Sequence, residues 1–302
     1  MELAGVRLAN PTILASGIVG VTPATLLRAA KGGAGAVTLK SIGPEPRAGH
    51  PNPTVLEWEC GLINAVGLSN PGPEEGAKEV AEAVRKIRKT PVIASFFAKN
   101  AAGFGDVAAK LAAAKPAMLE ANLSCPNTMH ETGIPFAYEP EHAAEAVKAI
   151  KAKAPGIPLI AKLSPNTHLL KQVARAVEAA GADAINMGNT LGPGMLIDVD
   201  ARKPVLANKA GGVSGAAVRP VAVRCVWDVY ESVRIPIIGT GGVSTGRDAL
   251  EMIMAGATAV GVGSAVAGGG FKVFGKIASE MDEWMAKSGV SSVKELIGVA
   301  HR

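Results

Sequence analysis

The sequence predicts an α/β protein built as a (β/α)8 TIM barrel. Three observations support this fold class. Eight short apolar segments recur along the chain, a segment of helical pattern follows each of them, and the apolar segments are continuous runs without polar alternation. Such runs are typical of parallel strands that are covered on both faces. A doubly wound sheet would also alternate strands and helices, but GTGGVSTG and GVGSAVAGGG both lack the GxGxxG spacing of a dinucleotide fold.

The predicted elements follow one another from the N-terminus to the C-terminus. Thr22 and Pro23 have the N-cap and first-turn chemistry of a helix start, and Pro73 opens the next helix in the same way. Ser244 is expected to cap a later helix, which Gly256 ends. The strands are expected at residues 12–17, 36–42, 91–98, 117–124, 158–164, 184–190, 236–242 and 259–265.

Three connections after predicted strands are long, at residues 43–72, 125–138 and 191–214. All three follow the carboxyl ends of strands, where barrels of this type place their active sites. They are rich in Gly, Pro and Asn, which favours ordered lids over linkers. We therefore expect one domain, residues 1–302, with long loops over the carboxyl face of the barrel.

Composition excludes several classes of protein. The chain is 48% hydrophobic and 19% charged, which argues against disorder. It has no apolar run of about 18 residues that could span a membrane, and MELAGVRLAN lacks the apolar core of a signal peptide, so a cytoplasmic protein is expected. The net charge of +5 does not indicate nucleic-acid binding, because the basic clusters VRKIRKT and VKAIKAKAP end amphipathic helices, where the helix dipole favours cations.

The cysteines and histidines indicate no metal site. The chain has three cysteines and five histidines, and both sets are scattered, so they predict neither a disulfide framework nor an iron–sulfur cluster. Cys225 lies in a helical pattern and is interpreted as a packing residue, whereas the role of Cys60 stays open, with packing favoured. Cys125 differs, because it follows a predicted strand in EANLSCPN and lies between two asparagines. Its position favours a base or a nucleophile.

Polar residues and glycines end every predicted strand. Lys40 and Lys162 lie inside TLKSI and IAKLS, and a buried lysine needs an anionic partner, so we interpret both as functional. The motifs GTGG and GVGS end the last two strands, where barrels often bind phosphate through backbone N–H groups, although tight turns without a ligand are an alternative. Four asparagines are expected to converge on the barrel mouth and to suit a planar heterocycle: Asn64, Asn122, Asn127 and Asn189.

Several motifs together resemble class 1 dihydroorotate dehydrogenase. They are NLSCPN, NAVGLSNPG, TLKSI, AKLSPN, NMGNT, ANKAGGVSG, IIGTGGV and VGVGS, and they cover nearly the whole chain. The resemblance implies a flavin barrel that binds FMN and oxidises dihydroorotate to orotate in pyrimidine biosynthesis. It also implies that Cys125 removes the C5 proton of dihydroorotate while the C6 hydride passes to FMN, and that Lys162 faces the N1/O2 edge of the flavin.

The resemblance further implies two sets of binding residues. The substrate-binding set is Lys40, Asn64, Ala65, Val66, Gly67, Leu68, Asn122, Asn127, Asn189 and Thr190. The FMN-binding set is Ser16, Lys40, Ser41, Asn122, Lys162, Gly188, Gly215, Gly241, Gly242, Gly263 and Ser264, of which the last four hold the phosphate. Two features depart from the family pattern. Ser95 stands where many relatives have an asparagine near the flavin, and residues 128–138 match the family's lid only loosely.

The subtype determines the electron acceptor. NAVGLSN and ANKAGGVSG resemble the B type, which works with NAD through an iron–sulfur flavoprotein subunit that carries FAD, in a heterotetramer around a homodimer core. Fumarate, the acceptor of the A type, is the alternative.

Two other functions stay open. A dihydropyrimidine dehydrogenase-like barrel would act on uracil or thymine, which lack the carboxylate that Asn127 and NAVGL suit, and a non-redox phosphate-binding barrel would be colourless.

Overall fold

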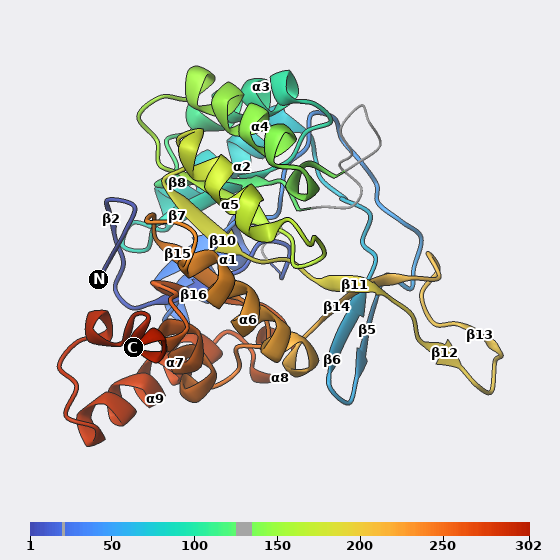
Figure 1. Ribbon diagram of the computed structural model, residues 1–302. Coiled ribbons are helices and arrows are strands. Elements are labelled where there is room, and N and C mark those ends of the chain that lie inside the picture. Colours follow the sequence, from blue (N-terminus) through green and yellow to red (C-terminus); the bar gives the residue numbers. More distant parts are fainter. Residues whose placement is uncertain (20–21, 125–134) are drawn as a thin grey trace.

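A closed barrel of eight parallel strands forms the centre of the part of the chain that the structure describes (Figure 1). The computed structural model describes residues 1–19, 22–124 and 135–302. The barrel strands are β3 (Thr12–Leu14), β4 (Ala36–Thr38), β7 (Val92–Phe96), β8 (Met118–Asn122), β9 (Leu159–Leu163), β10 (Ala184–Met187), β15 (Ile237–Thr240) and β16 (Ala259–Val262). The predicted fold class and all eight strand positions are confirmed. Each strand ends earlier than predicted, because the last residues of each predicted range belong to the connection that follows the strand.

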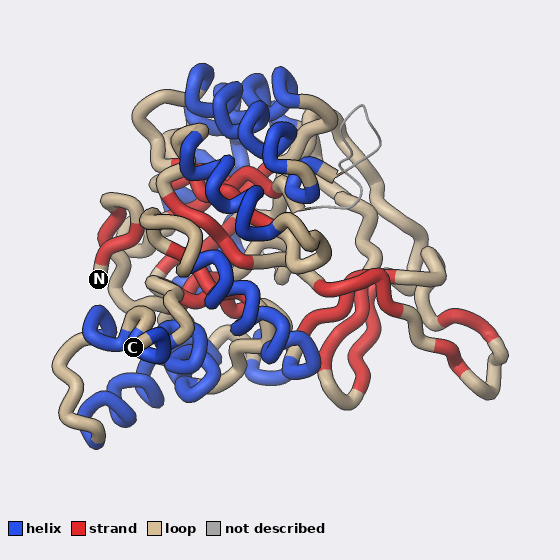
Figure 2. The backbone as a smooth tube through the Cα atoms, viewed as in Figure 1, coloured by secondary structure: helices blue, strands red, loops and turns tan. Residues whose placement is uncertain are grey.

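Helices surround the barrel (Figure 2). The α-helices are α1 (Pro23–Lys31), α2 (Pro73–Lys86), α3 (Ala101–Ala112), α4 (Pro140–Lys153), α5 (Leu170–Ala179), α6 (Arg219–Tyr230), α7 (Gly246–Met254), α8 (Ala265–Gly269) and α9 (Val273–Lys287). The short 3-10 helices are η1 (Phe136–Tyr138), η2 (Ala216–Val218), η3 (Val293–Leu296) and η4 (Val299–His301). In the described part of the chain, no helix is both long enough and apolar enough to cross a membrane.

Two of the three predicted helix starts are confirmed by the structure. The Thr22 side chain accepts a hydrogen bond from the Thr25 backbone at the start of α1, and Pro73 is the first residue of α2. The prediction for α7 was wrong by one residue, because Thr245 and not Ser244 is the N-cap. Only Thr245 stands three residues before Asp248, which is the spacing of a capping box.

Two of the long connections pair with each other to form a second sheet beside the barrel. This antiparallel sheet has the order β11 (Leu191–Gly194), β14 (Gly211–Ser214), β6 (Gly61–Asn64) and β5 (Val55–Trp58). The hairpin of β12 (Ile197–Asp198) and β13 (Lys203–Pro204) extends beyond it, and both project from one side of the barrel in Figures 1 and 2. The connections are therefore ordered, as predicted, although their strands were not anticipated.

The barrel interior contains an apolar layer at its amino end. Each of the eight strands contributes one side chain to this lower layer: Ile13, Ala36, Ile93, Met118, Ile160, Ala184, Ile238 and Ala259. The N-terminal hairpin of β1 (Glu2–Leu3) and β2 (Val6–Arg7) covers it, since Leu3 and Leu8 belong to the same buried cluster. A larger apolar cluster fills the space between the strands and the helices.

Candidate functional site

A polar layer lies above the apolar one. Side chains alternate between the two faces of a strand, so residues two positions further along also point into the barrel. On six neighbouring strands these upper-layer residues are Thr38, Ser95, Glu120, Lys162, Asn186 and Thr240. All except Thr240 are buried, and buried polar groups are costly unless they are paired. Their partners therefore determine what this layer can do.

Glu120 and Lys162 form the charged centre of the upper layer. Lys162 Nζ lies 3.9 Å from Glu120 Oε1 and donates a hydrogen bond of 2.9 Å to Ser16 Oγ, from the loop after β3. Glu120 also accepts hydrogen bonds from Ser95 Oγ at 2.9 Å and from Asn186 Nδ2 at 2.7 Å. The anionic partner that a buried Lys162 was expected to need is therefore Glu120, on the neighbouring strand.

A chain of hydrogen bonds connects this centre to two of the predicted asparagines. Ser95 Oγ and Ser41 Oγ lie 2.9 Å apart, and Asn122 Nδ2 donates to Ser41 Oγ at 3.3 Å. Asn122 Oδ1 accepts from Ser124 Oγ at 2.8 Å, which in turn accepts from Asn189 Nδ2 at 2.8 Å. Residues of the predicted FMN-binding and substrate-binding sets thus share one network.

The second sheet brings Asn64 and Thr190 to the same end of the barrel. Asn64 Nδ2 donates to the Gly212 carbonyl at 3.3 Å. Gly212 in turn faces Thr190, because a Cβ atom at Gly212 would lie 2.1 Å from Thr190 Oγ1. Thr190 also follows Asn189 directly and donates its backbone N–H to Asn189 Oδ1. Lys40 is partly exposed, two residues beyond the end of β4 at this end of the barrel.

The segment from Ala65 to Leu68 presents backbone donors. The carbonyl groups of Ala65 and Val66 contact Nδ1 and the backbone N–H of His50, each at 3.0 Å. Gly67 and Leu68 both have positive φ, at 76° and 57°, and no described residue accepts a hydrogen bond from their backbone N–H groups. Two adjacent free N–H groups are suited to a carboxylate.

Buried Asn70 holds this segment in shape. Its Oδ1 accepts from the backbone of Gly43 and Gly72, and its Nδ2 donates to the Leu68 carbonyl at 2.9 Å. Sequence reasoning did not select Asn70, since an asparagine beside proline and glycine is read as an ordinary turn residue. Only the contacts across the loop reveal that it fixes the Leu68 backbone.

Glycine turns after β15 and β16 offer a second set of free donors. Thr240 pairs with Gly261 in the parallel ladder, so the turns at Gly242 and Gly263 follow neighbouring strand ends at the same level. No described residue accepts a hydrogen bond from the backbone N–H of Gly242, Val243, Gly263 or Ser264. Gly242 also faces Gly215, since an added Cβ would lie 2.8 Å from the Gly215 carbonyl oxygen. This arrangement fits a phosphate group.

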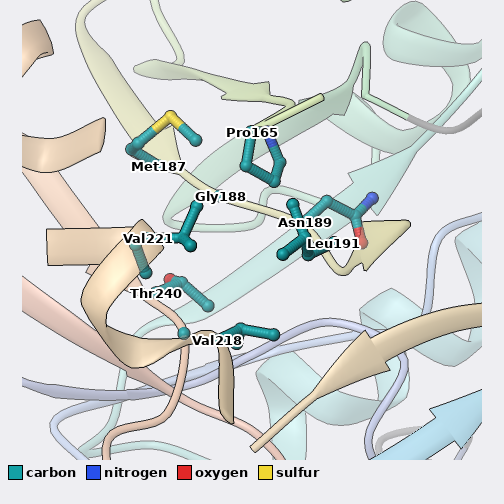
Figure 3. A pocket seen from close by; sticks show the side chains of 10 residues that line it. Pro165, Met187, Gly188, Asn189, Leu191, Val218, Val221 and Thr240 are labelled. Atoms are coloured by element: carbon teal, nitrogen blue, oxygen red, sulfur yellow. The ribbon is translucent and has the colours of Figure 1, made fainter. Parts of the chain in front are cut away.

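A pocket lies between the ends of β10 and β15 and the start of α6 (Figure 3). Its lining includes Gly188, Asn189, Thr240 and Gly241, together with apolar residues of η2 and α6. In Figure 3, Asn189 and Leu191 lie on the right, and Thr240 and Val218 lie lower down. Gly188 and Gly241, predicted from separate motifs, are therefore brought to one place.

The three cysteines differ in their surroundings. Cys125 and Asn127 lie outside the described residues. Cys225 is buried in α6, as predicted, and burial raises the pKa of its thiol to about 11. For Cys60 the sequence left the role open and favoured packing; the favoured role is wrong, because Cys60 is exposed in the turn that connects β5 and β6. Among the described residues, no group of three or more His, Cys, Asp or Glu side chains is placed to hold a metal ion.

Sequence reasoning missed several members of the network. Glu120, Asn186 and Ser124 were not selected, and Ser95 was considered only as a doubtful flavin contact. Glu120 stands two residues before Asn122, and the strand period places both side chains inside the barrel. Counting back by two from each selected strand-end residue is the signal that could have identified Glu120.

Comparisons with known proteins place the chain in one family. The family model described as dihydroorotate dehydrogenase matches residues 1–285. A protein of Methanosarcina mazei named "dihydroorotate dehydrogenase B (NAD(+)), catalytic subunit" is 45% identical over 301 residues, which are 99% of this chain and 94% of that protein. A protein of Pyrococcus furiosus with the same name is 45% identical over 302 residues, 100% of this chain and 98% of that protein. The resemblance predicted from the motifs is therefore confirmed, and the chain belongs to the dihydroorotate dehydrogenase family.

Proposed function

We propose that this protein oxidises (S)-dihydroorotate to orotate with FMN as its cofactor. The observation that carries the proposal is the position of Lys162. This buried cation lies in one network with the amides of Asn122 and Asn189. Its hydrogen-bond partner Ser16 lies in the same loop as Ile18, whose side chain faces Gly263, since a Cβ atom added at Gly263 would lie 3.4 Å from Ile18 Cγ1. A cation at this point suits the N1/O2 edge of a flavin whose phosphate binds at the glycine turns.

FMN, when bound, supplies the acceptor for the hydride that leaves C6 of the substrate. The protein's own residues do the rest. Cys125 removes the C5 proton as a thiolate, so that the C5–C6 double bond forms as the two hydrogens leave. The backbone N–H groups of Gly67 and Leu68 hold the substrate carboxylate, while Asn64, Asn122, Asn127, Asn189 and Thr190 hold the ring. The free N–H groups around Gly242 and Gly263 hold the cofactor phosphate.

A direct experiment tests this function. The purified protein is mixed with dihydroorotate without oxygen, and the visible absorbance of the flavin is followed. Rapid bleaching with orotate as product supports the proposal, and dihydrouracil should react far more slowly because it has no carboxylate for Gly67 and Leu68. The cofactor released by heat should be FMN. A colourless protein, or release of FAD, would overturn the proposal.

We further propose a B-type assembly in the cytoplasm. A cluster needs about four thiolates, and this chain has three separated cysteines, so NAD reduction would require a second subunit that carries the iron–sulfur cluster and FAD. The relatives are named as catalytic subunits of NAD-linked enzymes. The lone chain should therefore reduce an artificial acceptor but use NAD poorly, until that subunit is added. Efficient fumarate reduction would instead indicate the A type.

Exposed apolar residues support contact with further subunits. Val55 and Leu56 on β5 are 48% and 36% exposed, and Met195, Ile197 and Val199 in the region of the β12–β13 hairpin are 52%, 53% and 82% exposed. Apolar residues gathered on a projecting part of a protein are typical of an interface. We assign them to the homodimer. Substitution of Ile197 and Val199 by serine should lower the mass measured by light scattering.

A further inference from the structure

One charged residue at the centre of the barrel has no role in the proposed function. Among the described residues, only three charged side chains are buried: Glu120, Lys162 and Asp248. Asp248 completes the capping box at the start of α7 and pairs with Arg219. Lys162 is assigned to the flavin. Glu120 is 1% exposed, touches neither the glycine turns nor the segment from Ala65 to Leu68, and still requires an explanation.

The neighbours of Glu120 are hydrogen-bond donors and a cation. Ser95 Oγ donates to Oε1 and Asn186 Nδ2 donates to Oε2. Asn186 Oδ1 is occupied by Thr240 Oγ1 at 2.7 Å, which fixes the orientation of the Asn186 amide. Lys162 Nζ completes the set at 3.9 Å from Oε1. Donors on both oxygens and a nearby ammonium are the surroundings of an ionised carboxylate.

The same geometry determines which group donates and which accepts at each step of the hydrogen-bond chain. Because the Ser95 hydroxyl donates to Glu120, it accepts from Ser41, and Ser41 in turn accepts from Asn122 Nδ2. The Asn122 carbonyl is then left to accept from Ser124. A neutral amide in place of Glu120 could donate to Ser95 and so reverse the hydrogen bond between Ser41 and Ser95. The hydrogen-bond network that extends to Asn122 and Asn189 therefore favours the negatively charged form of the Glu120 side chain.

We infer that Glu120 is a positioning residue for Lys162 whose own negative charge also lowers the reduction potential of the bound flavin. This inference rests on the proposed function. A cation beside the flavin favours the anionic reduced form, and the Glu120 anion offsets part of that charge while it holds Lys162 in place. Glu120 therefore keeps the reduction potential of the flavin low enough for the reduced flavin to pass its electrons to the next acceptor.

The test is the midpoint potential of the FMN-loaded protein. In Glu120→Gln the Lys162 charge is no longer offset, so the potential should rise. We expect roughly a tenfold gain in the affinity for reduced relative to oxidised FMN, equivalent to about 30 mV for a two-electron couple. Lys162→Met should shift the potential downward, and the double variant should lie between the two. Glu79→Gln, an equal change on the half-buried face of α2, is the control and should leave the potential unchanged.

A merely structural role predicts a different result. A loosened barrel would bind oxidised and reduced FMN less tightly by the same factor and would leave the potential where it was. A folded, yellow Glu120→Gln protein with an unchanged or lower potential therefore overturns the inference. If Glu120→Gln does not fold, the double variant is compared with Lys162→Met alone, because the Glu120 anion lowers the potential by its own charge even without Lys162; a higher potential in the double variant supports the inference and an equal one overturns it. A colourless wild-type protein would refute the proposed function itself.

Discussion

Two layers of the barrel interior lie one step of the strand period apart and have opposite chemistry. The lower layer takes one apolar side chain from every strand and is covered by Leu3 and Leu8. The upper layer, two residues further along the same strands, contains Glu120, Lys162 and Asn186 in a closed set of polar contacts. Both layers share one backbone geometry, so the difference arises from side chains alone. Stability and chemistry should therefore be separable by substitution.

The largest effect is expected at Cys125. Cys125→Ala should leave FMN bound and the midpoint of urea unfolding unchanged, while flavin reduction by dihydroorotate slows at least about a hundredfold, as for a lost general base. Stopped-flow absorbance without oxygen measures this rate. Cys125→Ser should keep some activity and shift the optimum to higher pH, because serine is a much weaker acid than a thiol of pKa about 8.5. A wild-type rate in either variant would make Cys125 a structural residue.

A substitution in the lower layer should have the opposite effect, a loss of stability without a change at the flavin. Ile160→Ala removes a fully buried side chain two residues before Lys162 and should lower the free energy of unfolding by about 2–4 kcal/mol. Urea unfolding followed by circular dichroism measures the loss. The flavin potential of the folded variant should match that of the wild type, since no charged or hydrogen-bonding group has changed. A shifted potential would show that the two layers are coupled.

The glycine turns permit a sharper test of the mouth. Gly242 has φ of 74°, and an added Cβ would lie 2.6 Å from the Arg219 Cβ and 2.8 Å from the Gly215 carbonyl oxygen. Gly242→Ala should displace the turn and weaken FMN binding by roughly tenfold, at a strain of about 1–3 kcal/mol. Riboflavin, which lacks the phosphate, should lose much less affinity.

Gly156 provides the matched control. Its φ of 85° is equally unfavourable for alanine, but nothing lies within 4 Å of an added Cβ. Gly156→Ala should therefore lose a similar small amount of stability and keep its FMN affinity. Fluorescence titration of both flavins distinguishes the two variants. An equal loss of FMN and riboflavin binding in Gly242→Ala would contradict the assignment of the phosphate to this turn.

The sequence predicted the barrel because its signals are local. Continuous apolar runs and cap residues such as Thr22 and Pro73 act within a few residues of where they stand. The second sheet was missed because Gly211–Ser214 has little strand propensity of its own and depends on pairing with Gly61–Asn64, far away in the chain. Glu120 was missed for the same reason, since the donors that make a buried carboxylate tolerable come from three other strands and are invisible in the sequence.

The smallest effect is expected at Cys225, a second thiol, which is buried in α6 and should affect only how stability depends on pH. Burial raises the pKa of Cys225 from 9.0 to about 11, whereas an unfolded chain titrates near its ordinary value. Between these values unfolding releases a proton, so rising pH favours the unfolded state, and stability is lost at up to about 1.4 kcal/mol per pH unit. Below about pH 8 both states keep the proton, and no such loss is expected. Urea unfolding at about pH 8 and about pH 10 should therefore show the wild type losing roughly 1 kcal/mol more than Cys225→Ala, since every other titrating group cancels in the difference. Parallel losses in the two proteins would mean that the Cys225 thiol is open to water in the folded state.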